Sequence, residues 1–178
     1  MFTISLAVEV LERTPAVLRA LLAGLSDEWT TGNEGPDTWS PYDVVGHLIH
    51  GERTDWMARA RIILRQDPDP AHRTFQTFDR FAQFRESRGK SLAQLLDEFA
   101  AARRDNLIEL RALNLGDADL EKTGIHPKFG TVTLKQLLST WVAHDFDHLM
   151  QISRVMGKQL KDDVGPWTEF LRVVRATT

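Results

Sequence analysis

The sequence contains no cysteine, and this absence excludes several kinds of site. Disulfide bridges, thiolate zinc sites, iron–sulfur clusters and a cysteine nucleophile all require that residue. The chemistry available to the chain therefore comes from histidine, carboxylate and hydroxyl groups.

Long apolar runs and an excess of basic residues are also missing. No stretch of about 18 uncharged apolar residues occurs, and the N-terminal MFTISLAVEVLERT reaches Glu9 before a signal-like run is complete. The 25 Asp and Glu residues outnumber the 22 Lys and Arg residues, which gives a formal net charge of −3. We therefore expect no membrane span and no nucleic-acid partner, and we predict a cytoplasmic protein.

The composition is typical of one globular domain. The chain has 178 residues, of which 42% are hydrophobic and 26% are charged. This length is sufficient to bury a sizeable core, so we predict a single domain over residues 1–178. Several scattered arginines are interpreted as solvated helix faces, namely Arg59, Arg61, Arg65, Arg103 and Arg104.

Helical patterns alternate with connectors that contain proline and glycine, and no convincing run of alternating strand residues occurs. We predict an all-α four-helix bundle with long connectors and a short C-terminal helix. Its main helices are expected over about residues 4–25, 41–65, 92–113 and 134–156, with the short one after Pro166. Thr14-Pro15 interrupts the first of them, either as a kink or as an N-cap followed by proline at the first helical position. Ser40, Ser91 and Thr133 are typical N-terminal caps.

Two connectors are long enough to carry structure of their own. Residues 67–90 contain four phenylalanines, Phe75, Phe78, Phe81 and Phe84, which we expect to tuck under the bundle. Residues 122–132 are compatible with either a small hairpin or an irregular loop. On the third helix, we expect Leu92, Leu95, Phe99, Ala102, Leu110 and Leu113 to form the buried stripe.

The fourth helix carries two histidines on its apolar face. Steps of three and four residues lead through Trp141, His144, His148 and Ile152, which form one seam. One buried histidine is ordinarily a core residue with satisfied ring nitrogens. Two at i and i+4 lie about 6 Å apart at Cβ, a spacing at which both imidazoles can hold one metal ion.

A third ligand is needed to turn this pair into a strong site. His47, near the start of the second helix, is the best candidate, because the small residues Gly51, Thr54 and Ala58 follow it on the same face and would leave room for a substrate. His50 is a weaker alternative, and His72 and His126 lie in connectors where a surface or turn role is expected.

Three histidines without a fourth protein ligand describe an open, catalytic kind of metal site. Zinc or nickel is favoured, and iron(II) or manganese would also fit. The remaining ring nitrogens need partners, for which Gln151, Asp147 or Asn106 is available. Asp147 and Gln151 are also candidate general bases, whereas Asn106 is interpreted first as a plain buried hydrogen-bonding residue.

The segment HDFDH excludes one familiar metalloenzyme class. The protease motif His-Glu-x-x-His uses its glutamate as the general base, but Asp145 stands at that place here. Aspartate is one methylene shorter, and the chain offers no strand that could align a peptide. Phosphate-binding and dinucleotide-binding glycine motifs are absent as well.

Three segments resemble the DinB-like superfamily of metal-binding four-helix bundles. They are WSPYDVVGHLIHGERTDW (39–56), FDRFAQFRESRGKSLAQLLDEF (78–99) and HPKFGTVTLKQLLSTWVAHDFDHLMQISRVM (126–156). The most specific parts are GHL in the first segment and HDxxH followed by QI in the third. The resemblance implies that His47, His144 and His148 form the metal triad, and that the protein is a homodimer.

The resemblance also implies an activity. Similar proteins are S-transferases or isomerases that use low-molecular-weight thiols, and a metal-bound thiol cosubstrate would account for the missing cysteine. We therefore expect a metal-dependent enzyme, a transferase or a hydrolase, that presents a thiol or a water as a nucleophile to a small-molecule substrate. The alternative is a non-catalytic metal-binding bundle that serves as a binding or dimerisation module, with Trp29, Trp56 and Trp167 as interface residues.

Overall fold

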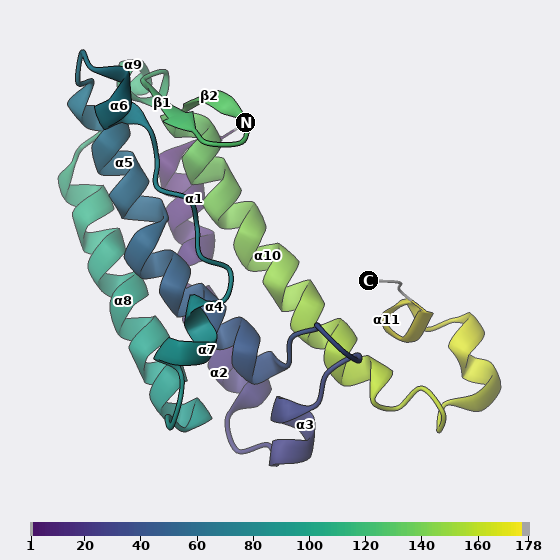
Figure 1. Ribbon diagram of the computed structural model, residues 1–178. Helices are drawn as coiled ribbons and strands as arrows, with labels where there is room; N and C mark the ends of the chain where they lie inside the picture. Colours follow the sequence, from purple (N-terminus) through teal and green to yellow (C-terminus); the bar gives the residue numbers. More distant parts are fainter. Residues whose placement is uncertain (1, 176–178) are drawn as a thin grey trace.

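The computed structural model describes residues 2–175 and contains a bundle of four long helical rods (Figure 1). The first rod consists of α1 (Ile4–Leu11) and α2 (Thr14–Leu22), and the second of α4 (Pro41–Thr54) and α5 (Trp56–Arg65). The third is α8 (Leu92–Ala112) and the fourth is α10 (Leu134–Lys158). Helix α8 contacts the first and the second rod, and so does α10. The first and second rods therefore lie at diagonally opposite corners of the bundle.

The predicted caps are confirmed. The hydroxyl groups of Ser40, Ser91 and Thr133 each accept a hydrogen bond from the backbone N–H three residues later. In each case the side chain of that later residue accepts a hydrogen bond from the N–H of the capping residue. These reciprocal bonds satisfy N–H groups that a helix start leaves without partners, so local sequence determines where three of the rods begin.

Two of the predicted helices are each divided into two. The first is interrupted after Leu11, where Pro15 cannot donate a backbone hydrogen bond and its ring conflicts with the carbonyl four residues earlier. The second changes direction at Asp55, whose φ and ψ are −108° and −71°. Just before it, the Thr54 hydroxyl donates to the carbonyl oxygen of His50 at 2.8 Å, a side-chain bond that commonly bends helices.

Short elements join the rods. They are α3 (Asp27–Thr31), α6 (Pro70–Arg73), α7 (Ala82–Glu86) and α9 (Asp117–Leu120). Strands β1 (Thr123–His126) and β2 (Gly130–Thr133) form an antiparallel hairpin in which Thr123 pairs with Thr133, so the hairpin alternative is confirmed. In place of one helix after Pro166, the chain forms a 3-10 turn η1 (Gly165–Glu169) and α11 (Arg172–Arg175), which packs against α10.

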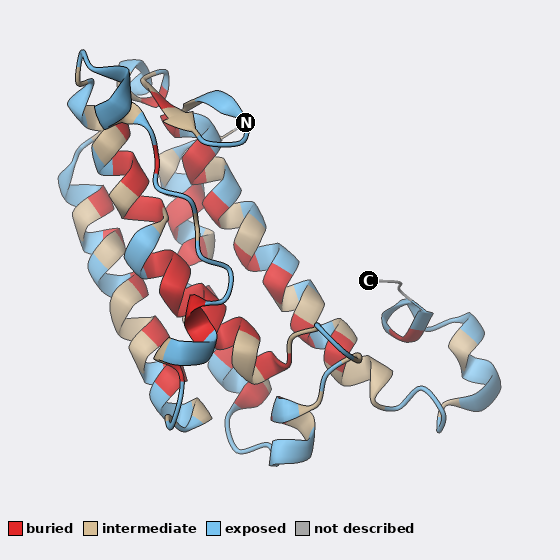
Figure 2. Ribbon diagram, in the orientation of Figure 1, coloured by how far each residue is buried: buried red, intermediate tan, exposed pale blue. Residues whose placement is uncertain are grey.

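The buried residues of α8 and α10 recur at helical spacing, whereas residues 44–52 of α4 are all buried (Figure 2). One cluster lies toward the hairpin end and includes Leu11, Ile63 and Trp141, and a second includes Leu18 and Phe99. Two expectations about single residues are wrong. Leu25 is exposed rather than an anchor, and Trp56 is 3% exposed and therefore belongs to the core rather than to a surface.

The buried face of α8 is turned relative to the predicted one. Its buried residues are Leu95, Leu96, Phe99, Arg103, Leu107 and Leu110. Leu113 is exposed, and Ala102 is only half-buried. The interpretation of Arg103 as solvated is wrong, because this side chain occupies a core position and is 1% exposed. The same interpretation of Arg59 in α5 is also wrong, because Arg59 is buried.

The connector between α5 and α8 runs across the bundle between α5 and α10 (Figure 1), but only part of it is buried. Phe75 is 3% exposed, whereas Phe81 and Phe84 are 62% and 43% exposed. The expectation that all four phenylalanines tuck in is therefore wrong. In the single turn α7 it is Ala82 and Gln83 that face inward, and the rings of Phe81 and Phe84 stack on each other outside.

Gly124 in β1 allows the Phe75 ring to lie close to the hairpin. A Cβ atom at this position would lie 2.6 Å from Cε1 of Phe75 and 2.9 Å from Cγ1 of Ile63. We expect Gly124→Ala to lower the free energy of unfolding by about 1–3 kcal/mol, because these buried side chains would have to shift. Urea denaturation measures the change. Gly116→Ala is the control, since its Cβ would meet nothing within 4 Å, and an equal effect of both changes would contradict the prediction.

Candidate metal centre

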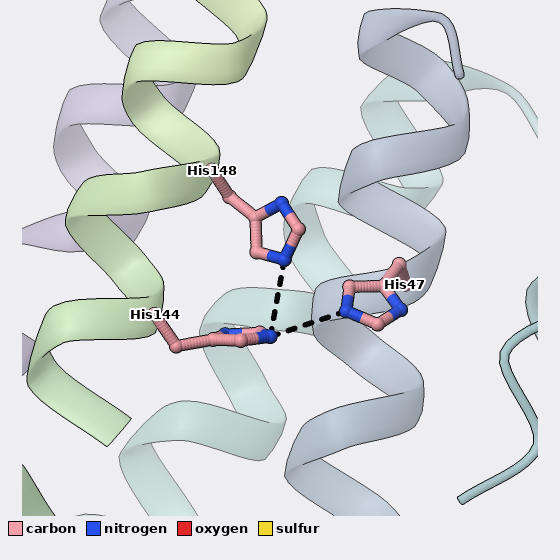
Figure 3. A group of neighbouring side chains, drawn as sticks. All are labelled: His47, His144 and His148. Carbon is pink, nitrogen blue, oxygen red and sulfur yellow. Dashed lines mark hydrogen bonds between the residues drawn. The ribbon is translucent and has the colours of Figure 1, made fainter. Parts of the chain in front are cut away.

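Three histidines from two helices converge on one point (Figure 3). His47 projects from α4, and His144 and His148 project from successive turns of α10. The Nε2 atom of His144 lies 3.1 Å from Nε2 of His47 and 3.0 Å from Nε2 of His148. The structure thus brings together the three residues that the sequence pattern and the resemblance selected.

Hydrogen bonds alone do not satisfy this arrangement. Nδ1 of His148 donates to Oε1 of Gln151 at 2.7 Å, so Nε2 of a neutral His148 carries a lone pair. The one N–H that Nε2 of His144 can carry cannot serve two nitrogens on different sides, so the two short contacts cannot both be good hydrogen bonds. A cation that accepts three lone pairs removes this conflict, and the donor set of three imidazoles therefore fits a divalent metal.

Burial keeps these imidazoles neutral. It is the main cause that lowers the pKa of His47 to about 3 and the pKa of His144 to about 2, and the neighbouring histidines lower both further. Burial also lowers the pKa of His148, although the hydrogen bond that its ring donates to Gln151 acts in the opposite direction. Neutral rings have the free lone pairs that metal binding requires.

Aromatic side chains hold the rings in place. Trp39 lies 4.8 Å from the His47 ring, Phe78 meets the same ring edge-on at 5.3 Å, and Trp56 meets His144 at 5.0 Å. Phe78 comes from the connector, which therefore covers the site. The Nδ1 atoms of His47 and His144 are buried and have no hydrogen-bond partner among residues 2–175. Gln151 is thus the one predicted partner that the structure places on a ring nitrogen of the triad.

The other candidate residues lie elsewhere. His50 is turned to Glu86, with Nδ1 3.1 Å from Oε1, and His72 is exposed beside Asp67. Asn106 donates to the backbone oxygen and to Oε2 of Glu52, so it is the buried hydrogen-bonding residue of the simpler interpretation. Asp147 is exposed but lines the cavity beside the triad.

Asp145 faces away from the triad into a buried ionic network that the sequence did not reveal. Its Oδ2 accepts hydrogen bonds from Nη1 of Arg103 and the hydroxyl of Thr14, both at 2.6 Å. Arg103 also donates to Oε1 of Glu52 at 2.8 Å, and the indole N–H of Trp141 donates to the same oxygen at 3.0 Å. Asp145 is therefore occupied structurally and does not act as the base of a protease motif.

A cavity of about 570 Å³ opens beside the three histidines. Its wall includes charged and polar side chains as well as aromatic ones, among them Arg59, Arg80, Asp55, Asp147 and Gln151. The volume is typical of a small-molecule site. We expected Gly51, Thr54 and Ala58 to leave room for a substrate. Of these three residues only Gly51 lines the cavity, and Thr54 is exposed.

Glu34 closes another part of the cavity wall through two ion pairs. Its carboxylate accepts from Nη2 of Arg154 at 2.7 Å and from Nζ of Lys158 at 2.8 Å. Burial acts to raise the pKa of Glu34, but the hydrogen bonds and charges of the two basic groups outweigh it and lower the pKa from 4.5. These bonds tie the α3–α4 segment to the end of α10.

The lowered pKa of Glu34 has a consequence for stability. A carboxyl whose pKa is depressed in the folded state stabilises that state above its unfolded pKa of 4.5, and this contribution disappears as the pH falls through the folded value. We expect Glu34→Gln to reduce stability at neutral pH and to have progressively less effect below pH 4.5. Urea denaturation across pH tests this, with exposed Glu121→Gln as the control. A pH-independent effect of Glu34→Gln would contradict it.

The fold and the site define a class: a helical bundle whose cavity is built around three converging histidines. The sequence model of the DinB superfamily matches residues 10–152, and the chain belongs to this superfamily. YfiT from Bacillus subtilis is a similar solved structure, with a TM-score of 0.74 and 19% sequence identity over 89% of this chain and 90% of that one. YfiT is described as a probable metal-dependent hydrolase with an unusual four-helix bundle topology. No curated protein matches the chain.

Among residues 2–175, no helix combines the length and the apolar character that crossing a membrane requires.

Proposed function

We propose that the protein is a metal-dependent enzyme that acts on small molecules, with a divalent ion held by Nε2 of His47, His144 and His148. The observation that carries the proposal is the convergence of these three nitrogens, at 3.0 and 3.1 Å from the central one, in the wall of a substrate-sized cavity. Among residues 2–175, no carboxylate or fourth histidine joins the cluster, and three imidazoles alone are typical of an open site.

The ion would supply Lewis-acid chemistry, which lowers the pKa of a thiol or a water so that its deprotonated form is available at neutral pH. The chain supplies the surroundings for this step. Phe78 and Trp39 exclude water from one side of the His47 ring, and Gln151 fixes the orientation of His148. Asp147 lines the same cavity and is the candidate proton acceptor, because the side-chain oxygen of Gln151 is already engaged.

Two reactions fit this site. In a thiol transfer, sulfur forms a bond to an electrophilic carbon, the bond from that carbon to its leaving group breaks with its electron pair, and the thiol proton is released. In a hydrolysis, water takes the place of the thiol. The chain contains no cysteine, so in the thiol version the sulfur would arrive with a low-molecular-weight cosubstrate. Zinc and nickel are the favoured ions, and iron(II) or manganese also suits imidazole ligands.

The first test is the metal content of the untagged protein, measured by elemental mass spectrometry. We expect close to one divalent ion per chain, its removal by a chelator with the fold retained, and its return with zinc or nickel. The loaded protein is then assayed with electrophiles in the presence and absence of small thiols. A wild-type protein that binds none of the four metals would overturn the proposal and favour a non-catalytic binding or dimerisation module. Unfolding upon metal removal would favour a structural ion.

The remaining expectations stand as parts of this proposal. We propose that residues 1–178 act as one domain, that the protein is a homodimer, and that it works in the cytoplasm. Sedimentation equilibrium tests the homodimer, and a monomer at all concentrations would exclude it. The interface interpretation now concerns Trp167, which is 68% exposed, and Trp29, which is half-buried, and not Trp56.

A further inference from the structure

The cavity beside the triad extends along one face of the second rod. His47, Gly51, Asp55 and Arg59 follow one another at intervals of four residues, and all four line the cavity. Residues at this spacing lie on successive turns of the same helix face. The cavity therefore has a far end, at Arg59, that lies three turns from His47 along α4 and α5.

Arg59 at this far end is a buried cation with unused donors. The residue is 8% exposed, and its guanidinium lies 5.2 Å from the centre of the Phe75 ring. Its Nε faces Oδ1 of Asp55 at 2.5 Å, and in the described part of the chain Asp55 is the one side chain with which it pairs. The two Nη groups have no acceptor among the described residues, and they are not among the fully buried polar atoms that lack a partner, so their N–H donors open to the cavity.

His126 in β1 adds a second donor to the same end. Its Nδ1 accepts hydrogen bonds from the backbone N–H groups of Lys128 and Phe129 at 3.1 and 3.2 Å. The proton of the neutral ring is therefore on Nε2, which can donate. The His126 ring meets Phe75 edge-on at 6.3 Å, so the same phenylalanine contacts both Arg59 and His126, and both residues line the cavity.

The charges around this end favour an anion. Burial lowers the pKa of His126, and the positive charges of Arg59 and Lys128 lower it further. The ring is therefore a neutral donor that lies in a positive field. The acidic group at this end is Asp55, which lies beside Nε of the Arg59 guanidinium. The two Nη groups of Arg59 are therefore available to a ligand in the cavity.

We propose that Arg59 and His126 bind an anionic group, a carboxylate or a phosphate, of the molecule whose reacting group lies at the three histidines. The position of the reacting group rests on the proposed function, but the anion site does not. An end-on guanidinium offers two parallel N–H donors, which match the two oxygens of a carboxylate or phosphate. The substrate is thus a small molecule with an anionic end, oriented by Arg59 so that its other end reaches the triad.

The test uses the metal-free wild-type protein, so that its failure is distinct from a failure of metal binding. Acetate and inorganic phosphate are titrated while the side-chain resonances of Arg59 and His126 are followed by NMR. We expect saturable shifts of both residues with at least one anion and none with neutral acetamide. The comparison of acetate with phosphate identifies the preferred group. Arg61, which is exposed and paired with Glu109, is the internal control and should not show saturation.

A variant provides the second arm. Arg59→Lys keeps a positive charge beside Asp55 but removes the fork, and we expect it to weaken anion binding by about tenfold or more. Arg61→Lys, two residues away, should bind as the wild type does. The absence of saturable shifts at Arg59 with both anions would overturn the proposal, and so would equal affinity of the wild type and a folded Arg59→Lys. Either result would leave the proposed metal binding at the three histidines untouched. Anion binding by the metal-free wild type would support the Arg59 and His126 site without bearing on the metal.

Discussion

Replacement of Arg103 by methionine is expected to lower the free energy of unfolding by about 3–5 kcal/mol, the range measured when one partner of a buried ion pair is removed. Arg103 is 1% exposed and donates to both Glu52 and Asp145, whose side chains are completely buried. Without the guanidinium, two carboxylates would remain in the core with no compensating charge. Urea denaturation followed by circular dichroism measures the loss.

The adjacent residue supplies a matched control. Arg104 is exposed and pairs only with its neighbour Asp105 in the described chain, so Arg104→Met should change stability by less than about 0.5 kcal/mol. A third variant separates charge from packing. Adding Glu52→Gln and Asp145→Asn to Arg103→Met removes the uncompensated charges and should recover part of the lost stability. Equal effects of the two single changes would refute the structural role of this network.

The second large effect is expected on metal affinity. His148→Ala removes one of three converging ligands. Loss of a residue that only orients a metal ligand lowers metal affinity roughly 10–100-fold, and we expect His148→Ala to lower the affinity for zinc by more than this. Competition with a chromogenic chelator measures the affinity. The variant should remain folded, because the ring is replaced at the wall of a cavity and no buried charge is left behind.

Two other histidines are the controls for this experiment. His72→Ala alters an exposed side chain, and His50→Ala removes a buried ring that is one turn from His47 but turned toward Glu86. Both should retain zinc with nearly wild-type affinity. Strong loss in His50→Ala with little loss in His148→Ala would assign the ligand set differently and would contradict the geometry of the cluster.

Local signals predicted much of the fold. The three capping residues and the apolar periodicity located the starts of the rods, since capping bonds and helix faces depend on residues within a few positions of each other. The division of two rods was less visible. Pro15 predicted the first division. The second, at Asp55, follows a hydrogen bond from the Thr54 hydroxyl to the backbone oxygen of His50, which the sequence did not predict.

The face of α8 shows a different limit. Arg103 stands at the helical spacing of Phe99 and Leu107, so the stripe through them contained the signal. We nevertheless expected a solvated arginine, because burial of a charge is unfavourable unless its partners are known. Those partners, Glu52 and Asp145, lie 51 and 42 residues away in sequence.

The sequence by itself determined that the chain is a helical bundle without cysteine chemistry, and it singled out His47, His144 and His148. The pair His144 and His148 follows from i, i+4 spacing, which is a property of a single helix, whereas His47 was selected by the small residues that follow it and by the resemblance. Only the tertiary structure decided that three Nε2 atoms meet, that Arg103 is buried, and that Arg59 and His126 share one end of the cavity. These facts depend on how separate rods pack, and packing is set by side chains that are far apart in the chain.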